Sequence, residues 1–91
     1  MKIRVMVTIK GQVQGVGFRH YTQQTALLHN VTGWVRNLPD GGVGGCFEGE
    51  EKDVRALIDW CQKGPDWAQV DEVLVEDEPS RGEFTHFNIR Y

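Results

Sequence analysis

The chain has 91 residues, 40% of them hydrophobic and 25% charged, a composition that fits a folded protein and excludes a disordered one. At this length we expect one domain over residues 1–91, because a second core would not fit. A net charge of −3 argues against a general nucleic-acid binder, since affinity for nucleic acid comes mainly from many phosphate contacts. No stretch is typical of a signal peptide or a membrane span, so we expect a cytoplasmic monomer with no nucleic-acid or membrane partner.

The charge is distributed unevenly along the chain. Residues 1–47 contain five basic residues and one acidic residue, a net charge of +4, whereas residues 48–91 contain five basic and twelve acidic residues, a net charge of −7. A small anion needs only one locally positive pocket, and the positive half contains a glycine-rich segment, GQVQGVGFRH, at residues 11–20. The two cysteines form no CxxC pair and the three histidines show no metal-ligand spacing, so we expect no metal and no cofactor.

The first half of the chain predicts a strand, a helix and a hairpin. Residues 3–10 alternate between apolar and polar side chains, as in a half-buried strand. Residues 18–30 follow the glycine-rich segment and fit a helix, with Asn30 at the left-handed position that ends it. The residues expected on one stripe of this helix are Phe18, Tyr21, Thr25 and Leu28, with Thr22, Ala26 and His29 beside it. Strands at 31–37 and 43–49 then flank a turn with the sequence LPDGG.

The second half predicts a helix and two strands. Residues 50–63 fit an amphipathic helix with the i, i+3, i+4, i+7 pattern at Val54, Leu57, Ile58 and Cys61. The acidic run 48–53 is interpreted as the start of this helix, where negative charge suits the helix dipole. Strands are expected at 69–78 and 84–91. The order β-α-β-β-α-β plus a short C-terminal strand predicts an α+β, ferredoxin-like split βαβ sandwich, with two helices on one face of an antiparallel sheet.

Three interpretations compete for GQVQGVGFR at residues 11–19. It is an ordinary glycine-rich connection, a dinucleotide-binding fingerprint, or a cradle of backbone amides that binds a phosphate at the start of the following helix. The spacing G-x-x-x-G-x-G does not fit the dinucleotide fingerprint, and no Gly-Lys-Ser/Thr occurs as in a Walker A loop. The plain connection and the cradle stay open; in the cradle, the planar guanidinium of Arg19 would bind two phosphate oxygens.

If a phosphate binds there, the sequence offers no group that would form a covalent intermediate. Cysteine phosphatases have their nucleophile six positions before the arginine, where this chain has Val13, and Arg19-His20 lacks the glycine that follows in histidine phosphatases. There is also no D-x-D pair and no metal-binding cluster. Such a site suits a phosphate with a good leaving group that water attacks directly. An acyl phosphate fits, because it expels a carboxylate whose conjugate acid has a pKa of about 4 and needs no general acid.

The whole chain closely resembles the acylphosphatase family. The resemblance is carried by GQVQGVGFR, by TGWVRNLPDG at the expected separation, and by the C-terminal FNIRY. It implies a single acylphosphatase-like domain with a ferredoxin-like fold. The implied activity is hydrolysis of the carboxyl–phosphate bond of small acyl phosphates, giving a carboxylate and inorganic phosphate, without a metal and without a covalent intermediate. Inorganic phosphate is then expected as product and inhibitor.

The resemblance also implies which residues form the site. The backbone amides of the phosphate cradle fall on Gly15, Val16, Gly17, Phe18 and Arg19. Arg19 is implied as the phosphate-binding arginine, a role that suits a guanidinium. Asn37 is implied as the residue that positions the attacking water, which an amide can hold as both donor and acceptor. The chain departs from the family pattern at Gln12, His29, Asn30, Gly44 and Gly45, of which the glycine pair should loosen its strand.

Several other candidates are given structural roles. His20 is expected to face solvent, since successive helix residues point about 100° apart and it adjoins Arg19. His29 is expected to be a partly buried packing residue. Cys46 and Cys61 are expected as free thiols on different layers, and the three tryptophans as packing residues. A regulatory module of the same fold, which would bind an anion without hydrolysing it, stays open as the alternative to an enzyme.

Overall fold

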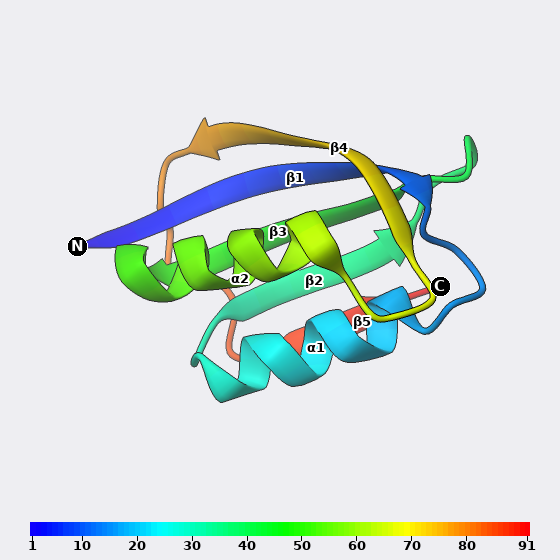
Figure 1. Cartoon of the computed structure of the whole chain (residues 1–91). Coiled ribbons are helices and arrows are strands. Elements are labelled where there is room, and N and C mark those ends of the chain that lie inside the picture. Colours follow the sequence, from blue (N-terminus) through cyan, green and yellow to red (C-terminus); the bar gives the residue numbers. More distant parts are fainter.

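The helices and strands occur in the predicted order and form two layers. The computed structural model describes all of residues 1–91, and its five strands form one sheet in the order β4-β1-β3-β2-β5, with both helices on one face (Figure 1). The elements are β1 (Lys2–Gln12), α1 (Phe18–Leu28), β2 (Thr32–Asn37), β3 (Val43–Glu50), α2 (Glu51–Lys63), β4 (Gln69–Glu78) and β5 (Phe87–Arg90). The expected ferredoxin-like α+β architecture is confirmed.

The sheet is mixed, whereas the sequence predicts an antiparallel one. All pairs among β1, β2, β3 and β4 are antiparallel, but β5 runs parallel to β2, from Gly33 opposite Phe87 to Arg36 opposite Arg90. The cause is the connection through residues 79–86. Since β4 and β5 lie at opposite edges, this segment crosses the sheet at one end, and β5 begins beside the beginning of β2 (Figure 1). The C-terminus therefore lies next to the end of β2.

A buried carboxylate fixes the crossing segment. Glu48, in β3, is only 3% exposed, and its Oε2 accepts hydrogen bonds from the Ser80 hydroxyl at 3.0 Å and from the amides of Arg81 and Gly82 at 2.7 and 3.2 Å. Burial alone would raise the pKa of Glu48, but these hydrogen bonds and the charge of Arg4 lower it below its ordinary value. The prediction that 48–53 starts a helix is thus wrong for Glu48, which belongs to β3.

Replacement of this carboxylate should destabilise the protein in a pH-dependent way. Because the pKa of Glu48 is lowered on folding, its contribution is complete above the unfolded value of about 4.3 and is lost as pH falls through the folded value. We expect Glu48→Gln to reduce the free energy of unfolding by about 1–3 kcal/mol at pH 7, and the difference from wild type to shrink toward pH 3. Urea unfolding at pH 7, 5, 4 and 3 measures this. Glu72→Gln on exposed β4 is the control, and a difference that persists unchanged at pH 3 would contradict the charge-based explanation.

The core lies between the sheet and the helices, and the two helices enter it differently. In α2 the predicted stripe is confirmed, because all four predicted residues are buried. In α1 the buried residues are Phe18, Thr22 and Ala26, whereas Tyr21 is 50% exposed and Leu28 is 78% exposed. The predicted stripe of α1 is therefore wrong after Phe18. Thr22 can be buried because its hydroxyl donates to the carbonyl of Phe18 at 2.7 Å, and this leaves the Tyr21 ring at the surface.

The glycine pair and the cysteines lie in the centre of the structure. β3 is paired along its length with β1 and β2, and both Gly44 and Gly45 keep their partners in this pairing. A Cβ on Gly45 would lie 2.8 Å from the Phe47 ring and 3.1 Å from the Trp34 carbonyl, so the missing side chain makes room for this ring. Cys46 and Cys61 are both buried and unpaired, as predicted, and burial raises the pKa of each thiol.

Candidate active site

The glycine-rich loop joins β1 to α1 and turns through two left-handed residues. Gly15 has φ 75° and Gly17, at the N-cap of α1, has φ 79°. A Cβ on Gly15 would meet no atom within 4 Å, so the requirement for glycine there comes from the backbone conformation and not from crowding. Gly15 and Gly17 are both exposed, and Val16 between them is half-buried. This conformation brings successive amides toward a common point.

The start of α1 presents unpaired backbone donors. The amides of residues 15–20 donate no hydrogen bond to any group of the chain, and Tyr21 is the first residue whose amide is bonded, to the Gly17 carbonyl at 3.0 Å. The first turn contains no acidic residue. Free N–H groups, the positive end of the helix dipole and a first turn without an acidic residue together favour an anion here. The five predicted cradle residues all lie in this stretch.

The Arg19 side chain is held by the C-terminus. Its Nη1 donates to the Arg90 carbonyl at 3.2 Å, and its guanidinium carbon lies 4.7 Å from the centre of the Tyr91 ring. A guanidinium packed over an aromatic face loses less freedom when it binds an anion, because its plane is already oriented. Tyr91 itself is fully exposed. The C-terminal strand thus contributes to the position of the arginine that the sequence singled out.

Asn37 lies at the same end of the molecule as Arg19. It is the last residue of β2, two positions after buried Val35, so its side chain points toward the helix layer. Arg90, whose carbonyl accepts from Arg19, pairs with Arg36 immediately before Asn37. The register of two parallel strands therefore places the predicted arginine and asparagine at the same end of the sheet. No side-chain hydrogen bond of the chain involves the Asn37 amide group, so both its donor and its acceptor are free.

Gln14 ties the glycine-rich loop to the turn that follows Asn37. Its Nε2 donates to the carbonyls of Leu38 and Gly42, both at 2.8 Å. One side chain thereby fixes the distance between the loop and the end of β2.

His20 is exposed, as predicted, with its ring centre 5.0 Å from that of Tyr21. No group of three or more His, Cys, Asp or Glu side chains is placed to hold a metal ion.

Sequence reasoning missed two contributions to this site. The contact of Arg19 with Arg90 and Tyr91 depends on the parallel pairing of β5, which the sequence did not predict. The role of Gln14 depends on the approach of the β2–β3 turn, and the only available signal was its place between two glycines of the loop. No helix of the chain is both long and apolar enough to span a membrane.

The fold defines a small α+β protein of the ferredoxin-like class, with a glycine-rich loop that presents free amides at the start of α1. The family model Acylphosphatase matches residues 5–89. The chain is 65% identical to an acylphosphatase of Geotalea uraniireducens over the full length of both, and 58% identical to that of Geobacter metallireducens, of which it covers 98%. The solved acylphosphatase structures of Coxiella burnetii and Bacillus subtilis superpose with TM-scores of 0.93 and 0.94, at 34% and 30% identity. Each match covers 98% of this chain, and 93% and 99% respectively of the other chain. The chain belongs to the acylphosphatase family.

Proposed function

We propose that this acylphosphatase, a hydrolase of acyl phosphates, carries out its reaction at the loop between β1 and α1, with Arg19 and Asn37 as its catalytic residues. The backbone amides of Gly15, Val16, Gly17, Phe18 and Arg19 form the phosphate cradle. The observation that supports this most strongly is the convergence of free amides, one oriented guanidinium and one free side-chain amide at a single end of the sheet. The domain is taken as residues 1–91 acting as one unit.

In this proposal the phosphoryl group is held from two sides. The amides of the loop donate to its oxygens at the start of α1, and the Arg19 guanidinium donates two parallel hydrogen bonds. Both kinds of donor are fixed before the substrate arrives, Arg19 by its contacts with Arg90 and Tyr91. Negative charge on the equatorial oxygens persists in the transition state, so donors that are already oriented stabilise it without reorganisation.

Asn37 is proposed to hold the attacking water. Its amide NH₂ can donate to the water oxygen while its carbonyl accepts one water proton, which orients a lone pair toward phosphorus. Neither His20 nor Asp40 is assigned as a base, since His20 is exposed beside Tyr21 and the Asp40 carboxylate accepts from the Gly42 amide at 3.0 Å. The proton of the water therefore passes to a phosphate oxygen of the substrate.

The bond changes then balance without further protein groups. The oxygen of water forms a bond to phosphorus, the bond between phosphorus and the bridging oxygen breaks, and that oxygen leaves with the electron pair as part of a carboxylate. Because the conjugate acid of the leaving group has a pKa of about 4, it departs as an anion without protonation. The products are the carboxylate and inorganic phosphate. The latter is expected to bind the same cradle and inhibit competitively.

Hydrolysis of benzoyl phosphate in the presence of EDTA tests the proposal as a whole. We expect the same rate with and without EDTA, and competitive inhibition by inorganic phosphate, since every proposed contact comes from protein donors. The decrease in ultraviolet absorbance of benzoyl phosphate measures the rate. A rate that falls in EDTA and returns on addition of a divalent metal would contradict the mechanism, as would inhibition by phosphate that does not compete with substrate.

We also infer a monomer located in the cytoplasm. Two buried, unpaired thiols are compatible with a reducing compartment. Edge strand β4 carries a row of acidic side chains, Asp71, Glu72, Glu76, Asp77 and Glu78, which disfavours pairing with a second copy through that edge. Sedimentation equilibrium at micromolar concentration tests the oligomeric state.

A further inference from the structure

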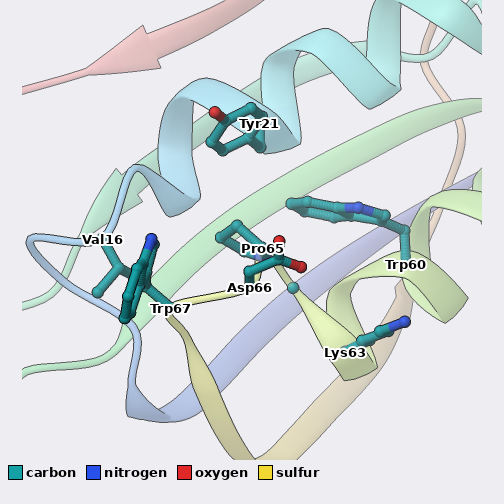
Figure 2. Close-up of a pocket in the computed structure, with 8 residues that line it drawn as sticks. Val16, Tyr21, Trp60, Lys63, Pro65, Asp66 and Trp67 are labelled. Atoms are coloured by element: carbon teal, nitrogen blue, oxygen red, sulfur yellow. The ribbon is translucent and has the colours of Figure 1, made fainter.

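A pocket lies directly beside the phosphate cradle. Its volume is about 440 Å³, and it is enclosed by α1, by the end of α2 and by the segment that follows α2. Figure 2 shows Trp67 next to Val16 at one end, Trp60 at the other, and Tyr21 and Pro65 between them. We call this the aromatic pocket. Its size lies within the range of small-molecule sites, about 300–1,000 Å³.

Three successive cradle residues form or support its wall. Val16, whose amide belongs to the cradle, directs its side chain into the pocket (Figure 2). A Cβ on Gly17 would lie 3.3 Å from the Tyr21 ring, so this pocket residue packs against the cradle backbone. Gly64, which also lines the pocket, is so close to Phe18 that a Cβ there would lie 2.7 Å from its ring. The loop that forms the proposed cradle therefore also forms part of the pocket wall.

Trp67 is placed as a binding surface and not as a packing residue. Trp60 packs against Phe18 with ring centres 5.4 Å apart, as the sequence predicts for a tryptophan. Trp67 contradicts that prediction, because it is 84% exposed although it lines the pocket. A rigid, flat and exposed aromatic side chain provides a large apolar contact area at low conformational cost when a ligand covers it.

We propose that the aromatic pocket binds an uncharged aromatic ring in the acyl group of the substrate while the cradle binds its phosphate. The proposal rests on the proposed function and specifies its substrate class as aromatic acyl phosphates. In an acyl phosphate one bridging oxygen joins phosphorus to the carbonyl carbon, so the acyl group must leave the cradle within two bonds. Val16, whose amide belongs to the proposed cradle and whose side chain lines the pocket, connects the two on this side. Flat indole, phenol and proline surfaces then offer stacking and edge contacts to a ring.

The charges around the pocket favour an uncharged group. Lys63 and Asp66 are its two charged lining residues, and their charges are opposite. No second cluster of cationic side chains is present there to bind a carboxylate or another phosphate. An acyl group with its own negative charge would therefore gain no partner beyond Lys63 and would be opposed by Asp66.

Substrate selectivity tests the inference. The quantity to measure is the ratio of kcat/KM for benzoyl phosphate to kcat/KM for acetyl phosphate, because acetyl phosphate has the same anhydride without a ring. We expect Trp67→Ala to lower this ratio by about 3- to 10-fold, the loss typical of one aromatic contact, and Trp67→Phe to restore most of it. Leu28→Ala removes another exposed apolar side chain of α1, far from the pocket, and should leave the ratio unchanged. A ratio unaffected by Trp67→Ala would overturn the proposal.

A binding measurement separates this inference from the proposed function. Two non-hydrolysable analogues, in which CH₂ replaces the bridging oxygen, keep the spacing between phosphorus and the acyl group: phenacylphosphonate for benzoyl phosphate and acetonylphosphonate for acetyl phosphate. Titration calorimetry of the wild type should give tighter binding of phenacylphosphonate, and Trp67→Ala should reduce this difference. Equal affinities of the wild type for the two phosphonates would overturn the aromatic pocket even if acyl phosphates are hydrolysed. Conversely, a wild-type protein that prefers phenacylphosphonate but hydrolyses neither acyl phosphate would retain the pocket and contradict the enzyme.

Discussion

Arg19→Lys is expected to lose acyl phosphate hydrolysis nearly as completely as Arg19→Ala. Removing a preorganised donor from a charged transition state typically lowers the rate by about 10²–10³-fold. Lysine keeps the positive charge but not the planar pair of donors, so it cannot form the two parallel hydrogen bonds that a phosphoryl group accepts. It also loses the packing of a flat guanidinium over Tyr91 at 4.7 Å and cannot hold the geometry given by the Arg90 carbonyl.

The measurement is kcat/KM for benzoyl phosphate, together with the inhibition constant of inorganic phosphate. In each Arg19 variant we expect kcat/KM to fall and the inhibition constant of phosphate to rise, because the guanidinium binds the phosphoryl group in the ground state and in the transition state. Arg55→Ala is the matched control: it removes the same charge from an exposed position of α2, where the side chain only pairs with Glu51 at 2.7 Å. Arg19→Lys activity above about one tenth of wild type would show that charge alone suffices, contrary to the preorganised-donor argument.

The fold could be predicted from the sequence because its elements carry strong local patterns. In α2 the apolar spacing identifies all four buried residues, and the alternation of residues 3–10 lies within β1. The stripe of α1 was placed on the wrong residues, because threonine and alanine next to larger apolar side chains give a weak apolar pattern, and Thr25 was expected on the stripe in place of Thr22. Burial of Thr22 depends on one hydrogen bond to the Phe18 carbonyl, which no periodicity reveals.

The direction of β5 depends on a contact between residues distant in sequence. Its parallel pairing follows from the path of residues 79–86, and that path is fixed by three hydrogen bonds to the buried Glu48 carboxylate. A carboxylate in an acidic run is more often a solvated residue or a helix start, so the sequence pattern favoured the wrong role for it. The consequence reaches the site, because Arg90 at the end of β5 and Tyr91 directly after it are the two residues that hold Arg19.

The candidate site was predictable in its local part only. The spacing of GQVQGVGFR predicts glycines at positive φ followed by free amides at the start of a helix, and the structure has both. The aromatic pocket was not predictable, since Trp67 comes from the segment after α2 and meets Val16 and Tyr21 only in the folded chain. The exposure of Tyr21 and Trp67, against the usual expectation for aromatic residues, is what marks the pocket once the structure is known.

Asn37→Ala is expected to lower kcat by about 10²–10³-fold while the affinity for inorganic phosphate changes by less than about threefold. The two quantities should separate because Asn37 is proposed to bind the water and not the phosphoryl group, whose donors are the loop amides and Arg19. The variant should fold normally, since the Asn37 side chain makes no hydrogen bond within the chain and its backbone pairing with Val43 on β3 is unaffected. Asn88→Ala, which removes an exposed amide from β5, provides the matched control and should keep full activity.

This separation also distinguishes an enzyme from a protein that only binds the anion. In an anion sensor of the same fold, the cradle and Arg19 would bind phosphate, but no water would need to be positioned and Asn37 would have no measurable role. Equal loss of turnover and of phosphate affinity in Asn37→Ala would instead place Asn37 among the phosphate ligands and contradict its assignment to the water. Asn37→Asp sharpens the distinction further. It preserves the shape of the side chain but replaces the NH₂ donor with a negative charge, so it should lower kcat and also weaken phosphate binding through repulsion.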